Sequence, residues 1–269
     1  MFRPRVGRLK GQSFNRMIPN ILTMLALCSG LTSFLFAVQQ RWEAAVLALV
    51  IAAILDALDG RIARILKLSS RFGAELDSLS DFFAFGVAPA MLLYLWSLEQ
   101  VGRVGWVLAL FYSVCCALRL ARFNTDLEEP AMPPWAKNYF TGVPSPAGAG
   151  LVLTPMILWF QIETPVLRSP YLVGVFVVVV ALLMVSRLPT YSFKNVRVPH
   201  RFVLIIMLIV ALIAAFIVIA PWLLMTVLIG FYMLTLPFGW RSFRRLQREA
   251  HEFQAQSALP LDSSAESET

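Results

Sequence analysis

The sequence predicts an all-α polytopic membrane protein with about eight transmembrane helices. Of its 269 residues, 58% are hydrophobic and only 14% are charged, whereas soluble domains carry about 25% charged residues. The apolar residues form long uninterrupted runs such as Val203–Val218. A transmembrane β-barrel would instead show segments of alternating polarity. These observations exclude a soluble enzyme, a disordered chain and a porin.

Eight segments are long enough to cross a bilayer, since a helix needs about 20 residues to span its apolar layer. They are 18–38, 43–64, 76–97, 104–122, 146–162, 170–188, 202–219 and 221–237. The first is too long for the apolar part of a cleaved signal peptide, so we expect it to remain as a membrane helix. The last two are separated by little more than Ala220-Pro221, which fits a tight helical hairpin or one long kinked segment.

The basic residues predict the orientation of these spans. All 23 Lys and Arg residues except Arg41, Arg103 and Arg168 lie in the two ends of the chain or in alternate connections and the span ends that flank them. The positive-inside rule therefore predicts that both termini are cytoplasmic, which requires an even number of spans. Because the basic residues flank the spans, we expect them to face anionic lipids and not nucleic acid.

The chain outside the spans divides into three parts. Residues 1–17 form a basic cytoplasmic segment, and residues 238–249 form a basic juxtamembrane segment that we expect to lie on anionic lipid. Residues 250–269 are polar and rich in Ser and Glu, a composition that predicts disorder. Residues 18–237 form the transmembrane domain.

Four aspartates lie at the end of the second span and the start of the third: Asp56, Asp59, Asp77 and Asp81. Helical spacing puts Asp56, Asp59 and Ala63 on one face of the second helix, and Gly73, Asp77 and Asp81 on one face of the third. A short loop joins the two helices, so the two faces can meet just inside the membrane surface. Converging carboxylates repel one another unless cations neutralise them, and oxygen ligands favour Mg²⁺, Mn²⁺ or Ca²⁺ over Zn²⁺.

Two glycines separate the pairs of acids. Gly60 and Gly73 carry no side chain where a nucleotide or phosphate would approach the backbone. Arg64 and the hydroxyls of Ser69, Ser70 and Ser78 are candidates for phosphate contacts.

Two other interpretations are open to these acids. They can form salt bridges with Arg61, Arg64 and Arg71 at the helix ends, but four acids at these spacings around two glycines disfavour that interpretation. They can also serve a cation channel or transporter, which would place them near the bilayer midplane, on broken helices or in repeated halves. These acids occur once, at one membrane edge.

The segment Asp56–Asp81 reads D-x-x-D-G-x-x-A-R-x8-G-x-x-x-D-x-x-x-D and resembles the signature of the CDP-alcohol phosphotransferases. The resemblance implies a six-helix core, here followed by two C-terminal helices, and a homodimer. It also implies two divalent metals held by the aspartates and a CDP-linked lipid whose nucleotide lies against this motif. The domain 18–237 is then catalytic.

Residue roles follow from the resemblance by position. Asp56, Asp59, Asp77 and Asp81 correspond to metal ligands, and Asp81 also corresponds to the proton acceptor. The residues that correspond to nucleotide or CDP-lipid contacts are Asn20, Thr23, Gly60, Ala63, Arg64, Ser70 and Gly73. The first two belong to the Pro19-Asn20-Ile21-Leu22-Thr23 segment of the first span.

Further stretches resemble the bacterial and archaeal membrane phosphatidylserine synthases of that family. They are 70–90, 117–124, 140–147 and 189–194. The implied substrates are CDP-diacylglycerol and L-serine, and the implied location is a cytoplasmic (inner) membrane with the site facing the cytoplasm. Glycerol phosphate, inositol phosphate and choline are the alternative acceptors.

The carboxylate of L-serine requires a cationic partner. Arg119, Arg122, Asn124 and Lys194 are the candidates for serine or phosphate contacts. For the two arginines the alternative is snorkelling to lipid phosphates, and for Lys194 it is a cytoplasmic flank without a ligand.

Overall fold

The computed structural model describes residues 17–66, 70–128, 139–186, 189–191 and 219–235, together with the short pieces 207–208, 211–212 and 215–217. The predicted segments 238–249 and 250–269 and almost all of 1–17 lie outside the described residues. So does Lys194, and the span 202–219 is described only in fragments.

The described chain is a helical bundle. Its elements are α1 (Ile18–Val38), α2 (Trp42–Leu66), α3 (Arg71–Asp81), a π-helical segment (Phe82–Val87), α4 (Ala88–Trp96), a 3₁₀ turn (Leu98–Val101), α5 (Arg103–Glu128), β1 (Tyr139–Thr141), α6 (Ser145–Val152), α7 (Thr154–Ile162), a 3₁₀ turn (Pro165–Arg168), α8 (Pro170–Val185) and β2 (Pro189–Tyr191). A further helix spans Pro221–Thr235. The prediction of an all-α protein therefore holds except for two strands of three residues each.

Helix starts follow a simple sequence rule. Six of the described helices carry proline in the first turn: Pro19 in α1, Pro89 in α4, Pro146 in α6, Pro155 in α7, Pro170 in α8 and Pro221 in the Pro221–Thr235 helix. Proline is tolerated there because the first backbone N–H groups of a helix have no partner within it. The predicted starts at residues 18 and 170 coincide with those of α1 and α8.

Three helical stretches are long and apolar enough to span a membrane: Ile18–Val38, Arg71–Trp96 and Arg103–Thr125. The pair α6 and α7 makes a fourth if it is counted as one span, although it is bent by 40°. The bend lies just before Pro155, which cannot donate a backbone hydrogen bond and whose ring excludes the carbonyl one turn earlier. The described residues thus support three to four spans, and the eight-span topology stays a prediction.

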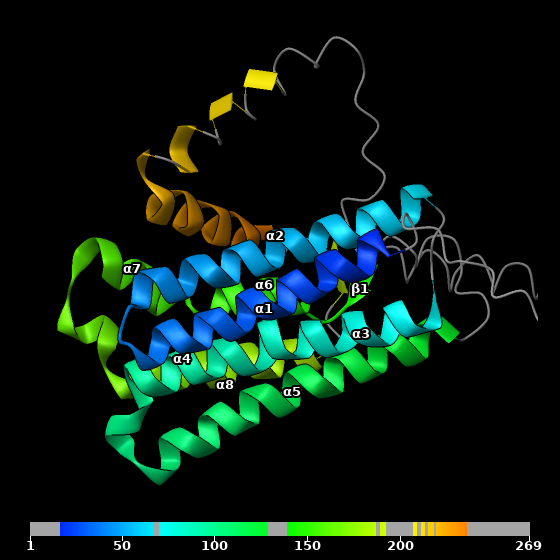
Figure 1. The fold of residues 1–269 in the computed structure, drawn as a ribbon. Helices are drawn as coiled ribbons and strands as arrows, with labels where there is room; N and C mark the ends of the chain where they lie inside the picture. The colour runs from blue at the N-terminus through cyan, green and yellow to red at the C-terminus, as the bar shows by residue number, and fades with distance from the viewer. Residues whose placement is uncertain are drawn as a thin grey trace, which may run out of the picture.

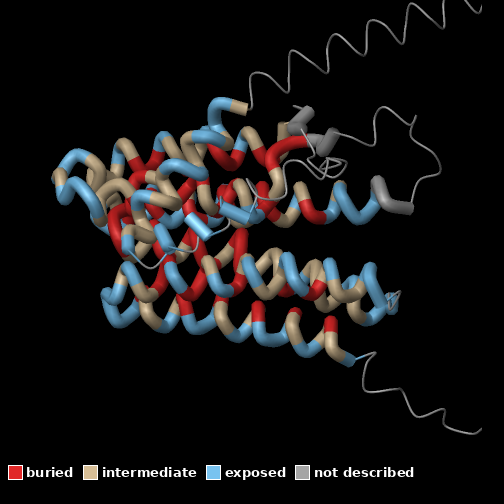
Figure 2. The backbone as a smooth tube through the Cα atoms, turned by 90° about the horizontal axis from the view of Figure 1, so that it is seen from above, coloured by how far each residue is buried: buried red, intermediate tan, exposed pale blue. Residues whose placement is uncertain are grey.

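The helices pack around a shared core. α1 packs against α2, α3 and α4, and α5 packs against α4 and α8. The largest fully buried side chains include Trp96, Tyr112 and Phe85. Buried residues lie on the inner sides of the helices and exposed ones on the outer sides, as Figure 2 shows. An apolar exterior such as that of α1, where Met24, Leu25 and Leu35 are about half exposed, suits a protein surrounded by lipid.

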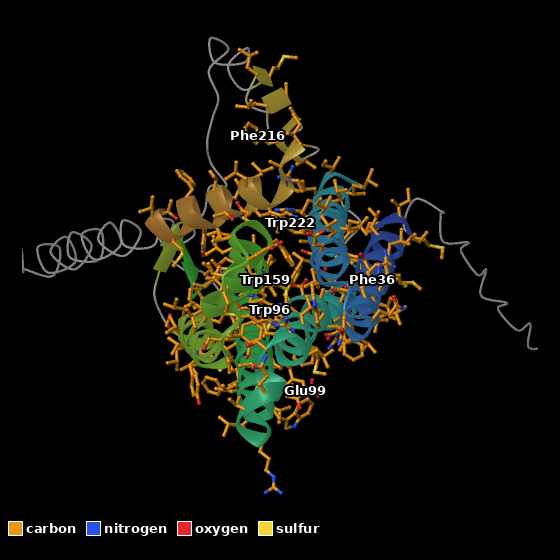
Figure 3. All side chains as sticks on the ribbon, turned by 90° about the vertical axis from the view of Figure 1, so that its left-hand side faces the viewer. Phe36, Trp96, Glu99, Trp159, Phe216 and Trp222 are labelled. Atoms are coloured by element: carbon orange, nitrogen blue, oxygen red, sulfur yellow. The ribbon has the colours of Figure 1, made fainter. Side chains whose placement is uncertain are left out.

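The bundle has two chemically different ends. The starts of α1 and α3 and the ends of α2 and α5 lie together at the right of Figure 1, at the end that carries the aspartates. We call this the acidic end. At the opposite end, which faces the viewer in Figure 3, Trp159 packs against Trp96 with ring centroids 5.9 Å apart. There Phe160 and Trp222, with ring centroids 4.5 Å apart, join α7 to the Pro221–Thr235 helix.

The two strands lie next to helix ends. β1 and β2 pair antiparallel, with Phe140 opposite Thr190. Gly142 follows β1 with φ of +78°, and a Cβ there would lie 2.6 Å from the carbonyl oxygen of Met184. Glycine is therefore required at this turn, for its left-handed backbone and for the close approach of α8.

Candidate active site

The structure brings three of the four aspartates together. Asp56, Asp59 and Asp77 each offer one carboxylate oxygen, and these oxygens lie within 4.8 Å of one another. Helix α1 packs against both α2 and α3 and holds the two acidic faces toward each other. The meeting of these faces agrees with the helical spacing of the acids.

Asp81 lies one turn beyond Asp77 and contacts Asp56 through its carboxyl group. Its Oδ1 atom is buried and has no hydrogen-bond partner among the described residues. A buried polar oxygen without a partner costs free energy on the order of 1–3 kcal/mol, and two adjacent carboxylates add repulsion. A bound cation would relieve both.

The acids therefore fit a hard divalent cation. Their donors are carboxylate oxygens, and the described metal-ligand cluster contains neither His nor Cys. Mg²⁺ and Mn²⁺ accept such oxygen ligands, whereas structural zinc sites are built mainly from Cys and His.

Asp59 is held by a neighbouring helix. Its side chain is 3% exposed, and its Oδ2 atom accepts a hydrogen bond of 2.5 Å from the hydroxyl of Thr23 on α1. Such a bond to a carboxylate is stronger than one between neutral groups. Thr23, predicted as a nucleotide contact, therefore orients an acid in this structure.

A polar pocket of 180 Å³ opens beside Asp59 and Asp77. Its lining is Pro19, Asn20, Thr23, Asp59, Gly60, Ala63, Ser70, Gly73, Ala74 and Asp77. It contains every predicted nucleotide contact except Arg64, and adds Pro19 and Ala74, which sequence reasoning missed. Each is adjacent in sequence to a predicted contact, Pro19 to Asn20 and Ala74 to Gly73. The helical spacing on which the predictions rest does not select these neighbours.

The start of α3 forms one wall of this pocket. The Ser70 hydroxyl accepts a hydrogen bond of 2.9 Å from the backbone N–H of Gly73 and so caps the helix. A Cβ on Gly73 would lie 2.7 Å from Oδ1 of Asn20. Gly73 therefore lets α1 and α3 approach closely, and Ser70 fixes the helix end whose N–H groups and dipole favour an anion.

Gly60 differs from Gly73. A Cβ on Gly60 would meet no protein atom within 4 Å, so packing among the described residues does not require glycine there. Glycine inside a helix costs about 1 kcal/mol relative to alanine. The open space over Gly60 belongs to the polar pocket, which fits close approach of a ligand.

Arg64 is not among the residues that line the polar pocket. Its side chain is exposed, and its Nε donates to the carbonyl oxygen of Gly60 in the same helix at 2.9 Å. Its predicted phosphate contact stays a prediction.

Arg119 approaches the acids from α5. Its guanidinium is close enough to Asp81 to interact electrostatically, and its Nη1 donates to the hydroxyl of Ser145 at 2.6 Å. Ser145, the first residue of α6, is fully buried. Ser145 was not among the predicted site residues, although it lies in the stretch 140–147.

The other predicted acceptor contacts bond to the protein itself. Arg122 donates to the carbonyl oxygen of Val185 at 2.9 Å, which ties α5 to the end of α8. Asn124 donates to the hydroxyl of Ser78 at 2.9 Å, which ties α5 to α3. Their substrate roles stay predictions, and Lys194 lies outside the described residues.

Comparison with known proteins identifies the family. The family model of CDP-alcohol phosphatidyltransferase matches residues 16–186, which is more than half of the chain. The chain belongs to the CDP-alcohol phosphatidyltransferase family. This membership places the aspartates in a group-transfer enzyme and argues against a cation channel or transporter.

Several relatives carry one name, CDP-diacylglycerol–serine O-phosphatidyltransferase. The protein of that name from Mycobacterium leprae is 41% identical over 224 residues, 83% of this chain and 74% of the relative. The one from Helicobacter pylori is 31% identical over 81% of this chain and 88% of the relative. The one from the archaeon Methanocaldococcus jannaschii is 33% identical over 66% of this chain and 75% of the relative.

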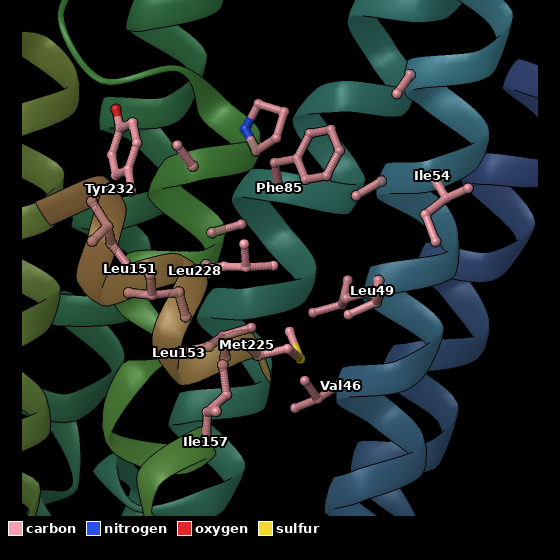
Figure 4. A pocket seen from close by; sticks show the side chains of 18 of the residues that line it. Val46, Leu49, Ile54, Phe85, Leu151, Leu153, Ile157, Met225, Leu228 and Tyr232 are labelled. Atoms are coloured by element: carbon pink, nitrogen blue, oxygen red, sulfur yellow. The ribbon is translucent and has the colours of Figure 1, made fainter. Parts of the chain in front are cut away.

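This member of the family also contains an apolar pocket of 570 Å³. α2, α6, α7 and the Pro221–Thr235 helix form it, with side chains such as Leu49, Ile54, Phe85, Leu151 and Leu228 pointing into it (Figure 4). Arg61 and Tyr232 also line the pocket. Tyr232 belongs to the predicted span 221–237, in which sequence reasoning selected no residue, although a phenol hydroxyl within an apolar run was a signal.

Proposed function

We propose that the chain transfers the phosphatidyl group of CDP-diacylglycerol to the hydroxyl of L-serine, giving phosphatidylserine and CMP. The observation that carries this proposal is the 41% identity, over 83% of this chain, to a protein named for that reaction. The family match covers α1 to α8 and therefore includes both the acids and the polar pocket.

The polar and apolar pockets suit the two parts of the lipid substrate. The polar pocket, with the start of α3 and the space over Gly60, suits the cytidine diphosphate. The apolar pocket suits an acyl chain, since burying each CH₂ group contributes about 0.8 kcal/mol. Arg61 lines the apolar pocket and is exposed, so it suits a lipid phosphate at the membrane surface.

The aspartates suit a divalent cation, Mg²⁺ or Mn²⁺, with Ca²⁺ as a further candidate. Asp56, Asp59 and Asp77 would hold it, with Asp81 beside them, and two ions per protomer follow from the family resemblance. Bound there, the cation would neutralise charge on the diphosphate and on the leaving CMP. The residues of the chain would position the two substrates, CDP-diacylglycerol and L-serine.

We assign proton transfer to Asp81. The serine oxygen forms a bond to phosphorus, the bond from phosphorus to the CMP oxygen breaks, and the serine hydroxyl proton passes to a carboxylate oxygen of Asp81. The partnerless Oδ1 of Asp81 supports this role, because a general base needs a free oxygen within reach of the proton.

We further propose the arrangement in the membrane. Eight spans within a catalytic domain 18–237 put both termini and the acidic end in the cytoplasm, in a bacterial-type inner membrane. The segment 238–249 lies on anionic lipid, the tail 250–269 is disordered, and the protein is a homodimer, as the family resemblance implies.

An acceptor assay tests the reaction. Purified protein in mixed micelles receives CDP-diacylglycerol, a divalent cation and one radiolabelled acceptor: L-serine, glycerol phosphate, inositol phosphate or choline. We expect labelled lipid and stoichiometric CMP with L-serine and none with the others, and a reaction without acceptor measures hydrolysis. A lipid product from glycerol phosphate but not from L-serine would overturn the proposal.

A further inference from the structure

The Pro221–Thr235 helix is docked against α7 by specific contacts. Trp222 packs on Phe160 with ring centroids 4.5 Å apart, and Nε2 of Gln161 donates to the Thr226 hydroxyl at 2.8 Å. Met225, Ile229 and Tyr232 follow at helical spacing and line the apolar pocket. These contacts fix where Tyr232 enters the bundle.

Tyr232 points its polar atom out of an otherwise apolar surface. In Figure 4 its phenol oxygen is directed away from Leu228 and Met225, toward the end of the pocket where Ile54 and Phe85 lie. Asp56 lies two residues beyond Ile54 in α2, and Asp81 lies one helical turn before Phe85. The hydroxyl is therefore directed toward the aspartates.

Three buried polar atoms near one another have no hydrogen-bond partner among the described residues. They are the Tyr232 hydroxyl, Nε of Arg119 and Oδ1 of Asp81. Arg119 interacts electrostatically with both Tyr232 and Asp81, so both groups lie near its guanidinium. Buried polar groups usually have partners, and three such atoms, one on Arg119 and two on groups near it, indicate a small polar ligand.

These three atoms match the chemistry of L-serine. Two are N–H or O–H donors, as a carboxylate requires, and the third is a carboxylate oxygen that can accept from an alcohol. They lie around Arg119, whereas the polar pocket is built on Asp59 and Asp77. An in-line displacement needs the attacking oxygen and the leaving group on opposite sides of phosphorus, so the Arg119 side is the side for the acceptor.

We propose that Tyr232 determines acceptor specificity: its hydroxyl and Nε of Arg119 donate to the carboxylate of L-serine, and the serine hydroxyl faces Asp81. This inference rests on the proposed function. It gives the helix that follows the family core a role at the active site.

Removing one oxygen atom tests this role. Tyr232→Phe keeps the ring in the apolar pocket, so the fold is preserved. We expect the apparent KM for L-serine to rise about tenfold, as loss of a hydrogen bond to a charged group predicts, with the KM for CDP-diacylglycerol unchanged. Tyr171→Phe is the matched control, because Tyr171 is 79% exposed at the start of α8, and its KM values should equal those of the unmodified protein.

A second variant tests the role of Tyr232 independently of the first substitution. Tyr232→Met fills the pocket with a flexible apolar side chain, and we expect the same rise in the serine KM. Unchanged KM values for L-serine in both variants would overturn the role of Tyr232 but not the proposed function. A rise confined to the KM for CDP-diacylglycerol would also overturn it, because that result would assign the hydroxyl to the lipid. An unmodified protein without activity toward L-serine would instead overturn the proposed function.

Discussion

Asp59 shows how single residues prepare the site. It is 3% exposed, and its carboxylate receives the Thr23 hydroxyl from one side and faces Asp56 and Asp77 on the other. Burying a carboxylate is costly unless hydrogen bonds or an opposite charge compensate. One hydroxyl compensates in part, and a bound cation would complete the compensation.

Replacing one acid should separate cation binding from folding. We expect Asp77→Asn to abolish CMP release and to weaken Mn²⁺ binding at least about tenfold, since even indirect supports of metal ligands are worth that much. Electron paramagnetic resonance of free Mn²⁺ measures the affinity without substrate. Glu75→Gln, an exposed acid two residues away on α3, is the control and should bind normally. Unchanged Mn²⁺ affinity in Asp77→Asn would remove this residue from the ligand set.

Gly60 allows a second test, of close approach by the nucleotide. A methyl group there meets no protein atom within 4 Å, so Gly60→Ala should leave Tm unchanged or raise it, because alanine favours helix by about 1 kcal/mol. The apparent KM for CDP-diacylglycerol should rise at least about tenfold, the usual effect of one methyl group in a pocket. Gly230→Ala, also in a helix and also without neighbours within 4 Å, should change neither KM. A normal KM in Gly60→Ala would argue against nucleotide over this residue.

At the scale of elements, the third span is more than a straight helix. α3 passes into the π-helical segment Phe82–Val87 directly after Asp81. The Tyr112 hydroxyl of α5 donates to the carbonyl oxygen of Phe85 at 3.1 Å. π-Helical turns are rare and are frequent at functional sites, and here α5 holds the turn that follows Asp81.

The sequence predicts element positions well and their irregularities poorly. The apolar run 18–38 matches α1 residue for residue, because lipid requires an unbroken helix of that length. The π-helical segment leaves the apolar run 76–97 unchanged, so hydropathy cannot show it. β1 and β2 pair residues about fifty positions apart, a contact that no local pattern specifies.

The same distinction applies to the site. The acids and glycines were predictable because a fixed helical spacing places them on two faces joined by a short loop. The contact of Thr23 with Asp59 spans 36 positions, and that of Arg119 with Ser145 spans 26. Such pairs depend on how helices pack, which the spacing of residues within each helix does not specify.

At the scale of the whole molecule, the two ends of the bundle differ in chemistry: one carries the acids and the other carries an aromatic cluster. The acidic end carries Asp56–Asp81, and the opposite end carries Trp96 and Trp159 with Arg168, whose Nε donates to the carbonyl oxygen of Trp96 at 3.0 Å. Arg168 is one of only three basic residues predicted outside the cytoplasm. The hydrogen bond to a backbone carbonyl gives Arg168 a partner within the protein. An arginine on the side predicted to be non-cytoplasmic is therefore compatible with the positive-inside rule.

The number of spans decides on which side of the membrane the C-terminus lies, and chemical labelling can determine it. In a background in which Cys28, Cys115 and Cys116 are replaced by alanine, we introduce Ala220→Cys or Ser263→Cys. If 202–219 and 221–237 form a hairpin, a membrane-impermeant maleimide should label position 220 in intact cells and position 263 only after permeabilisation. The basic residues Arg241, Arg244, Arg245 and Arg248 favour that outcome, because each of them disfavours translocation of its flank. Labelling of position 263 in intact cells would instead indicate one kinked segment and an odd number of spans. As a control, serine phosphatidyltransfer is measured in both cysteine variants, because retained activity shows that the labelled protein has its native arrangement.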